Sequence, residues 1–187
     1  AAEVQLLLAE FKLLGANAPK SAQEYLTEGC RLSAYVYDKA AELNQVPYYS
    51  RTCVNDPLDA TIKIDDTMVN EMLSHDAFKL TGDTKSDLEK VYIQQILHFL
   101  MSPIDAYSTA RRSGVPKIGS SIFPRMDYSA NGYPVTNIPR RVALNAPNPT
   151  DLMYDNLIEA YKEQGLSVGS GDILNSCLFI HISEPTR

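Results

Sequence analysis

Residues 92–116 constrain the fold of this chain more than any other stretch of its sequence. Apolar residues at helical spacing come first, and Ser102 and Pro103 then supply a favoured N-cap and a favoured first-turn residue for a second helix. Gly114 and Pro116 end that helix, because glycine accepts a left-handed backbone and proline disfavours helix in the residue before it. The stretch therefore predicts two consecutive helices and a sharp exit from the second.

Two arginines, Arg111 and Arg112, stand just before this exit. Their guanidinium groups offer about ten N–H donors, so groups rich in acceptors are expected nearby. An anion or phosphate site is one interpretation. We favour a structural one, because residues 113–149 contain six prolines and three glycines, lack helical periodicity and leave many carbonyl groups to be satisfied. Arg140 and Arg141, further along this segment, are assigned the same structural role.

The first part of the chain predicts a helical hairpin. One helix ends near Gly15, a favoured C-terminal stop, and the next begins near Ser21 and runs to about Leu43. The face of the first helix that is expected to pack carries five apolar residues at helical spacing: Val4, Leu7, Leu8, Phe11 and Leu14.

Gly29 and Ser33 lie four residues apart in the second helix, so these two small residues share a face. A glycine inside a helix costs about 1 kcal/mol relative to alanine. The simplest compensation is a close approach of the neighbouring helix, and we expect the two helices of the hairpin to touch tightly here.

Two more helices and one short strand are expected. One helix is capped by Asp66 and broken by Gly82 and Asp83, and the helix that continues into residues 92–116 opens with a capping box formed by Ser86 and Glu89. The last helix covers residues 149–164, and the strand covers residues 178–182.

The composition and motifs exclude several function classes. The net charge of −6 opposes general binding to nucleic acid, and no apolar run approaches the ~20 residues that a membrane helix needs. No phosphate loop, nucleophile elbow, EF-hand or zinc motif occurs, so neither a catalytic site nor a metal nor a cofactor is indicated. Cys30 is expected to be a small buried apolar residue, and disulfide pairing among Cys30, Cys53 and Cys177 stays open. His75 and His98 are interpreted as structural.

Tyrosines in expected loops are the candidate ligand-binding residues. Tyrosine combines a flat apolar face with a hydroxyl group, which suits sugar rings or peptide backbones, and binding residues concentrate in loops. The alternative is that each ring packs on its own loop, and for any single tyrosine we favour it. For the adjacent pair the two interpretations are even. The candidates are Tyr48, Tyr49, Tyr128 and Tyr133.

Four segments, taken in order, form a recognisable pattern. The first two are the Ala9-Glu10 pair and Tyr25 through Gly29 to Ser33. The third runs from the helix that contains Gln94 and Gln95 to Arg111-Arg112-Ser113-Gly114-Val115-Pro116, and the fourth is Ile138-Pro139-Arg140-Arg141. The most specific feature is the order of the last two arginine-containing elements. Together the segments resemble the SusD/RagB family of outer-membrane nutrient-binding lipoproteins of Bacteroidetes. The resemblance covers about residues 3–168.

The chain departs from the family at two places. Tyr107 stands where members usually have tryptophan, a residue that this chain lacks, and Val142-Ala143 replaces the usual Tyr-Pro. Members are also longer. We therefore expect residues 1–187 to be the C-terminal portion of a single SusD-like domain, with the signal peptide and the lipidated cysteine before Ala1.

The resemblance implies a mainly α fold of tetratricopeptide-like helical hairpins, with a long irregular segment rich in proline and arginine and little β structure. It implies a lipoprotein on the outer face of the outer membrane, anchored by a lipid outside this chain. Such a protein is no enzyme: it captures an oligosaccharide, or less often a peptide, and passes it to a SusC-like TonB-dependent β-barrel transporter. The alternative is a helical-repeat module that binds another protein and no small ligand.

Overall fold

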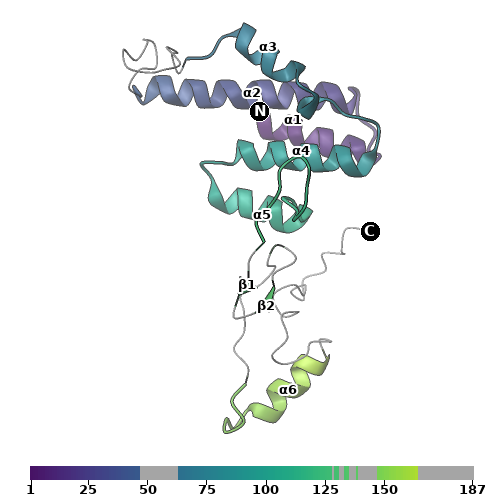
Figure 1. Cartoon of the computed structure of the whole chain (residues 1–187), viewed down its shortest axis with the longest axis vertical. Helices are drawn as coiled ribbons and strands as arrows, with labels where there is room; N and C mark the ends of the chain where they lie inside the picture. Colours follow the sequence, from purple (N-terminus) through teal and green to yellow (C-terminus); the bar gives the residue numbers. More distant parts are fainter. Residues whose placement is uncertain (47–62, 128, 131–132, 135–137, 139–146, 164–187) are drawn as a thin grey trace. The chain divides into compact units, whose positions relative to one another are not determined.

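The computed structural model describes residues 1–46, 63–127, 129–130, 133–134, 138 and 147–163. These parts are mainly α, as the sequence predicts, and no helix in them is long and apolar enough to span a membrane (Figure 1). In chain order the elements are α1 Ala2–Leu13, α2 Ala22–Leu43, α3 Asp66–Ser74, the 3-10 helix η1 Asp76–Phe78, α4 Thr84–His98, α5 Pro103–Ser113, β1 Ser129–Ala130, β2 Tyr133–Pro134 and α6 Tyr154–Glu163.

The chain divides into two compact units, Ala1–Tyr107 and Ser108–Arg187. In the first unit, α1 packs against both α2 and α4, and α3 lies along α2 (Figure 1). The 12-residue α1 is therefore the central element of this unit, although α2, with 22 residues, is longer.

The core of the first unit forms where α1 meets α2 and α4. Its buried members are Leu6, Ala9, Tyr25, Leu26, Cys30 and Val91. Gly29 lies in the middle of the α1–α2 contact: a Cβ atom added there would stand 2.7 Å from Leu6 Cδ2 and 3.2 Å from the Leu6 backbone nitrogen. The predicted tight approach of the two helices at Gly29 is confirmed.

The predicted packing face of α1 is correct only in part. Leu8 is partly buried and packs against the core, whereas Val4, Phe11 and Leu14 are about half exposed, at 54, 48 and 60 %. The fully buried positions of α1 are Ala2, Leu6, Ala9 and Glu10. The contact of Leu6 with Gly29 directs this side of α1 toward α2, and the rest of the predicted face stays more exposed.

Local capping explains where the helices begin. The Ser21 hydroxyl accepts from the Glu24 backbone N–H at 3.2 Å, and the Glu24 carboxylate accepts from the Ser21 N–H at 2.8 Å, which completes a capping box for α2. At α3 the cap is Asp65, which accepts from the Met68 N–H at 2.9 Å, so the prediction of Asp66 was wrong by one residue.

The start of α4 also differs from the prediction. Asp83 caps this helix by accepting from the Ser86 N–H at 2.9 Å, so Ser86 lies inside the first turn and does not open a capping box. Asp87 points back instead: its buried carboxylate accepts from the backbone N–H groups of Thr81 and Gly82, at 2.7 and 2.9 Å. Asp83 is the cap in place of Ser86, because the Asp83 side chain reaches the free N–H groups of the first turn.

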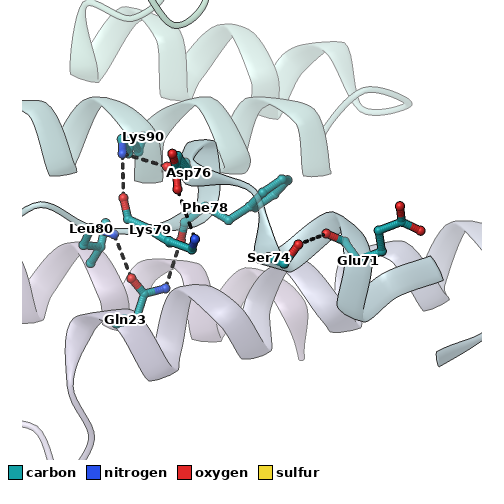
Figure 2. Close-up of polar contacts among 8 residues, drawn as sticks. All are labelled: Gln23, Glu71, Ser74, Asp76, Phe78, Lys79, Leu80 and Lys90. Atoms are coloured by element: carbon teal, nitrogen blue, oxygen red, sulfur yellow. Dashed lines mark hydrogen bonds and ion pairs between the residues drawn. The ribbon is translucent and has the colours of Figure 1, made fainter. Parts of the chain in front are cut away.

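The helix after Asp65 ends earlier than expected, at Ser74, and a connector of irregular backbone leads to α4. Gln23 of α2 holds this connector by donating to the Phe78 carbonyl at 2.9 Å and accepting from the Leu80 N–H at 2.7 Å (Figure 2). From the other side, Lys90 of α4 donates to the carbonyls of Asp76 and Lys79, at 3.0 and 2.5 Å. Side chains of two helices thus bind backbone groups of the connector, among them the Asp76 carbonyl, which also accepts from the Lys79 N–H at 3.1 Å.

A row of polar side chains on α2 holds α3 and the residues just before it. Arg31 donates to Asn70 at 2.8 Å, and Asp38 accepts from the Ile64 N–H at 3.1 Å. Between them, the Tyr35 hydroxyl donates to the Asp66 carboxylate, and this hydrogen bond raises the pKa of Tyr35. The three α2 residues are three or four positions apart, so they line one face of the helix.

In the second unit, α5 ends as predicted, with Gly114 in the left-handed region at φ +71°. The Val115–Pro116 peptide bond is cis, and residues 114–127 contain neither helix nor strand. The helix expected from residue 149 begins only at Tyr154, because Asn148 and Asp151 side chains accept backbone N–H groups and form turns instead. The strand expected at residues 178–182 lies outside the described residues.

The close approach at Gly29 yields a first prediction. Gly29→Ala should lower the free energy of unfolding by about 1–2 kcal/mol, because overpacking against Leu6 outweighs the better helix propensity of alanine. Urea denaturation followed by circular dichroism measures the change. The control is the double variant Leu6→Ala, Gly29→Ala. It should be more stable than the sum of the two single changes predicts, and strict additivity would contradict the proposed clash.

Candidate functional site at the end of α4

A buried carboxylate joins α1 to α4. Glu10, which is 1 % exposed, accepts from Gln95 Nε2 at 2.9 Å and from the Tyr92 hydroxyl at 3.2 Å. Gln95 is also buried, and its Nε2 reaches the Leu6 carbonyl at 3.3 Å. Since an ionised group is costly to bury without partners, this network fixes the register of α4 on α1.

One turn further along, His98 joins the end of α4 to α2. The His98 Nδ1 atom and the Ser33 hydroxyl are 2.9 Å apart, and the Tyr37 hydroxyl donates to the His98 carbonyl at 2.7 Å. The imidazole is half-buried beside the Phe99 ring, at 5.3 Å between centroids. Burial lowers the pKa of His98, and the prediction that His98 is structural agrees with these contacts.

The chain then turns sharply between α4 and α5. The Ser102 N–H donates to the Phe99 carbonyl at 2.8 Å, and the Ser102 hydroxyl donates to Asp105 in the first turn of α5. The Ala106 N–H donates to the Ser102 carbonyl at 3.0 Å, which agrees with the predicted start of a helix at this serine. The turn is thus held by its own backbone as well as by α2.

This turn exposes a group of large apolar side chains, which we call the α4–α5 stripe. Leu100 and Met101, in the turn itself, are 70 and 80 % exposed, and Ile104, in the first turn of α5, is 78 % exposed. The stripe consists of Leu97, Leu100, Met101, Ile104 and Tyr107. Apolar groups gathered in this way on a surface commonly mark a place where another surface binds.

Among the described residues, no group of three His, Cys, Asp or Glu side chains is placed to hold a metal ion. Burial raises the pKa of Cys30 to about 12, so this thiol stays protonated and behaves as the small apolar residue that the sequence predicts.

The predicted site residues do not all fall within the described structure. Tyr133 begins β2 and pairs with Ala130 of β1. Arg111 and Arg112 lie in the last turn of α5, half-buried and exposed respectively. The remaining predicted residues, Tyr48, Tyr49, Tyr128, Arg140 and Arg141, lie outside the described residues. Of the four tyrosines the structure describes Tyr133 alone, so the proposed role of the set stays a prediction.

Two features of the site were missed from the sequence. Glu10 occupies a helical position four residues after Leu6, and an acid within an apolar repeat is a signal of a buried polar contact. The α4–α5 stripe could be found in part, because residues 97, 100, 101 and 104 are apolar and close together in the sequence. The exposure of these side chains could not be predicted, because it depends on which other segments of the chain cover them.

No protein-family model, curated protein or solved structure matches this chain.

The Glu10 network gives a second prediction. Gln95→Leu should lower the free energy of unfolding by about 2 kcal/mol, because the buried carboxylate loses a hydrogen bond that nothing replaces. The matched control is Gln94→Leu, a change at the neighbouring half-buried position, which should stay within about 0.5 kcal/mol. Chemical denaturation at pH 7 measures both, and equal effects would contradict the assigned role of Gln95.

Proposed function

We propose that this chain is part of a SusD-like protein that captures a nutrient at the bacterial outer surface. The ligand is an oligosaccharide in preference to a peptide, and it is delivered to a SusC-like TonB-dependent β-barrel transporter. The protein is an outward-facing lipoprotein of the outer membrane and catalyses no reaction.

The observation that carries this proposal concerns the segments of the resemblance. Three of the four segments fall on described helices, and the residues that characterise them touch one another. Gly29 meets Leu6 of α1, and Gln95 of α4 donates to Glu10 of the Ala-Glu pair. Ser33 closes the set by its hydrogen bond to His98. Residues that characterise a family are expected to contact one another when they define the scaffold that its members share.

The helical arrangement supports the finer part of the proposal, which is a fold of tetratricopeptide-like hairpins. The antiparallel pair α1 and α2 packs through small residues, and α4 covers the other side of α1 (Figure 1). Stacked helical pairs of this kind bury each helix against its neighbours and expose the loops between them. Ligand recognition then belongs to loops, and the sequence predicts loops at Tyr48, Tyr49 and Tyr128.

A protein-interaction module without a small ligand is the second candidate, and the α4–α5 stripe favours it. Leu100, Met101 and Ile104 give no hydrogen-bonding groups for a sugar, whereas they suit the apolar core of a protein interface. In the first proposal the same surface is available for the transporter, so the two candidates differ in whether a small ligand binds as well.

Ligand binding gives the third prediction. A mixture of oligosaccharides should raise the melting temperature of the protein by about 5 °C at ligand concentrations near 100 times Kd, since binding stabilises only the folded state. A peptide mixture should give a smaller shift. Scanning fluorimetry of the full chain measures both.

The variants of this experiment separate the two candidates. The double variant Tyr48→Ala, Tyr49→Ala should lose the shift, and the control Tyr107→Ala, a change of an exposed tyrosine in the α4–α5 stripe, should retain it. If no mixture shifts the melting temperature, while Ile104→Ser weakens co-purification with a β-barrel partner, the interaction module is the correct function.

A further inference from the structure

The side of α2 that packs on α1 continues past the start of α1. Leu26 and Gly29 are buried on this side, and Leu6 of α1 already lies at Gly29. The helix α2 has 22 residues and α1 has 12, and the two run in opposite directions. The second half of α2 therefore extends beyond the first residue of α1 (Figure 1).

This second half carries an apolar stripe, which we call the α2 seam: Val36, Ala40 and Leu43. Its residues follow Gly29 at spacings of three, four and seven, so they prolong the buried side of the helix. Val36 and Leu43 are nevertheless 52 and 70 % exposed, and Ala40 is exposed as well. A helix side that is apolar but uncovered is suited to pack against another helix.

We propose that the α2 seam is a homodimer interface, at which the seams of two copies of this chain pack antiparallel about a twofold axis near Ala40. A twofold axis makes positions at nearly equal distances before and after Ala40 oppose each other. Val36 then packs against Leu43 of the second copy, and the small side chain of Ala40 lets the two helices approach closely at the axis. In the same register, Lys39 of one copy lies beside Glu42 of the other.

The charges beside the seam favour a second copy as the occupant. Lys39 and Glu42 form an ion pair within one copy, and their side chains are 62 and 48 % exposed. In the antiparallel pair each lysine has a glutamate of both copies within reach, and the group of four charges is neutral. A parallel pair in register would instead place Lys39 beside Lys39, and like charges at an interface oppose binding. An occupant of one sign of charge would find both signs here.

The size of the seam determines how strong the contact is. A specific interface buries about 800 Å² per partner, which is more than three side chains provide. The α4–α5 turn adds apolar area at the same end of the first unit, because the Tyr37 hydroxyl donates to the His98 carbonyl at 2.7 Å and Leu100 and Met101 follow. An interface at the low end of the size range predicts a reversible dimer with a dissociation constant of about 10–100 µM. The dimer is independent of the proposed nutrient binding.

Sedimentation velocity of the full chain, at about 5–200 µM and pH 7, measures the dimer. Ala40→Glu should raise the dissociation constant by about tenfold or more, because two carboxylates then meet at the axis. The matched control is Ala16→Glu, the same change at an exposed residue outside the seam, which should leave the dissociation constant unchanged. Circular dichroism establishes that both variants keep their helix content.

Charge-reversal variants test the register. Lys39→Glu alone and Glu42→Lys alone should each raise the dissociation constant by about tenfold, because each makes like charges meet across the axis. An equimolar mixture of the two variants should dimerise within about threefold of the unmodified protein, since opposite charges meet in the mixed pair. The ion pair inside each copy is absent in the mixture too, so recovery reports the contact between copies.

Three results would overturn the proposal. One is an unmodified protein that stays monomeric up to about 200 µM. The second is a dimer that Ala40→Glu does not weaken. The third is a mixture of the charge variants that dimerises no better than either variant alone. Lys39 and Glu42 are both largely exposed, so this last result does not depend on the folding of Ala40→Glu.

Discussion

The contact between Leu6 and Gly29 is the constraint on which the rest of the first unit depends. Because Gly29 has no side chain, the Leu6 side chain reaches the α2 backbone, and a Cβ atom there would stand 2.7 Å from it. This approach sets which side of α1 faces α2. The Leu6 carbonyl accepts from Gln95, so the same residue also takes part in the placement of α4. Leu6 of α1 thus contacts α2 through its side chain and α4 through its backbone carbonyl.

Hydrogen bonds of buried polar groups then fix how the helices of this unit are positioned along one another. Apolar packing alone tolerates shifts along a helix, because one apolar contact can replace another at similar cost. The Glu10 carboxylate cannot shift in this way, since it is buried and needs the donors of Gln95 and Tyr92 at fixed positions. The same holds for Gln23 and Lys90, which bind backbone groups of the connector between α3 and α4 (Figure 2). In this unit, apolar contacts supply stability and buried hydrogen bonds supply register.

Features that depend on neighbouring residues could be predicted from the sequence, and features that depend on distant ones could not. The stops at Gly15 and Gly114 are correct because a left-handed backbone is a local property of glycine, and both have positive φ. The N-caps of α3 and α4 were misplaced by one and three residues, because the preceding acids Asp65 and Asp83 accept from the first-turn N–H groups. The buried face of α1 was predicted only in part, because periodicity does not tell which side of an apolar helix a partner helix will cover.

The residues that carry the family resemblance lie at contacts between helices. Gly29, Ser33 and Gln95 contact other helices, so changing them alters the stability of the helical scaffold. Side chains of the connecting segments also take part in this scaffold, since Ala18 and Leu80 pack against the core. The sequence pattern therefore bears on how the helices pack.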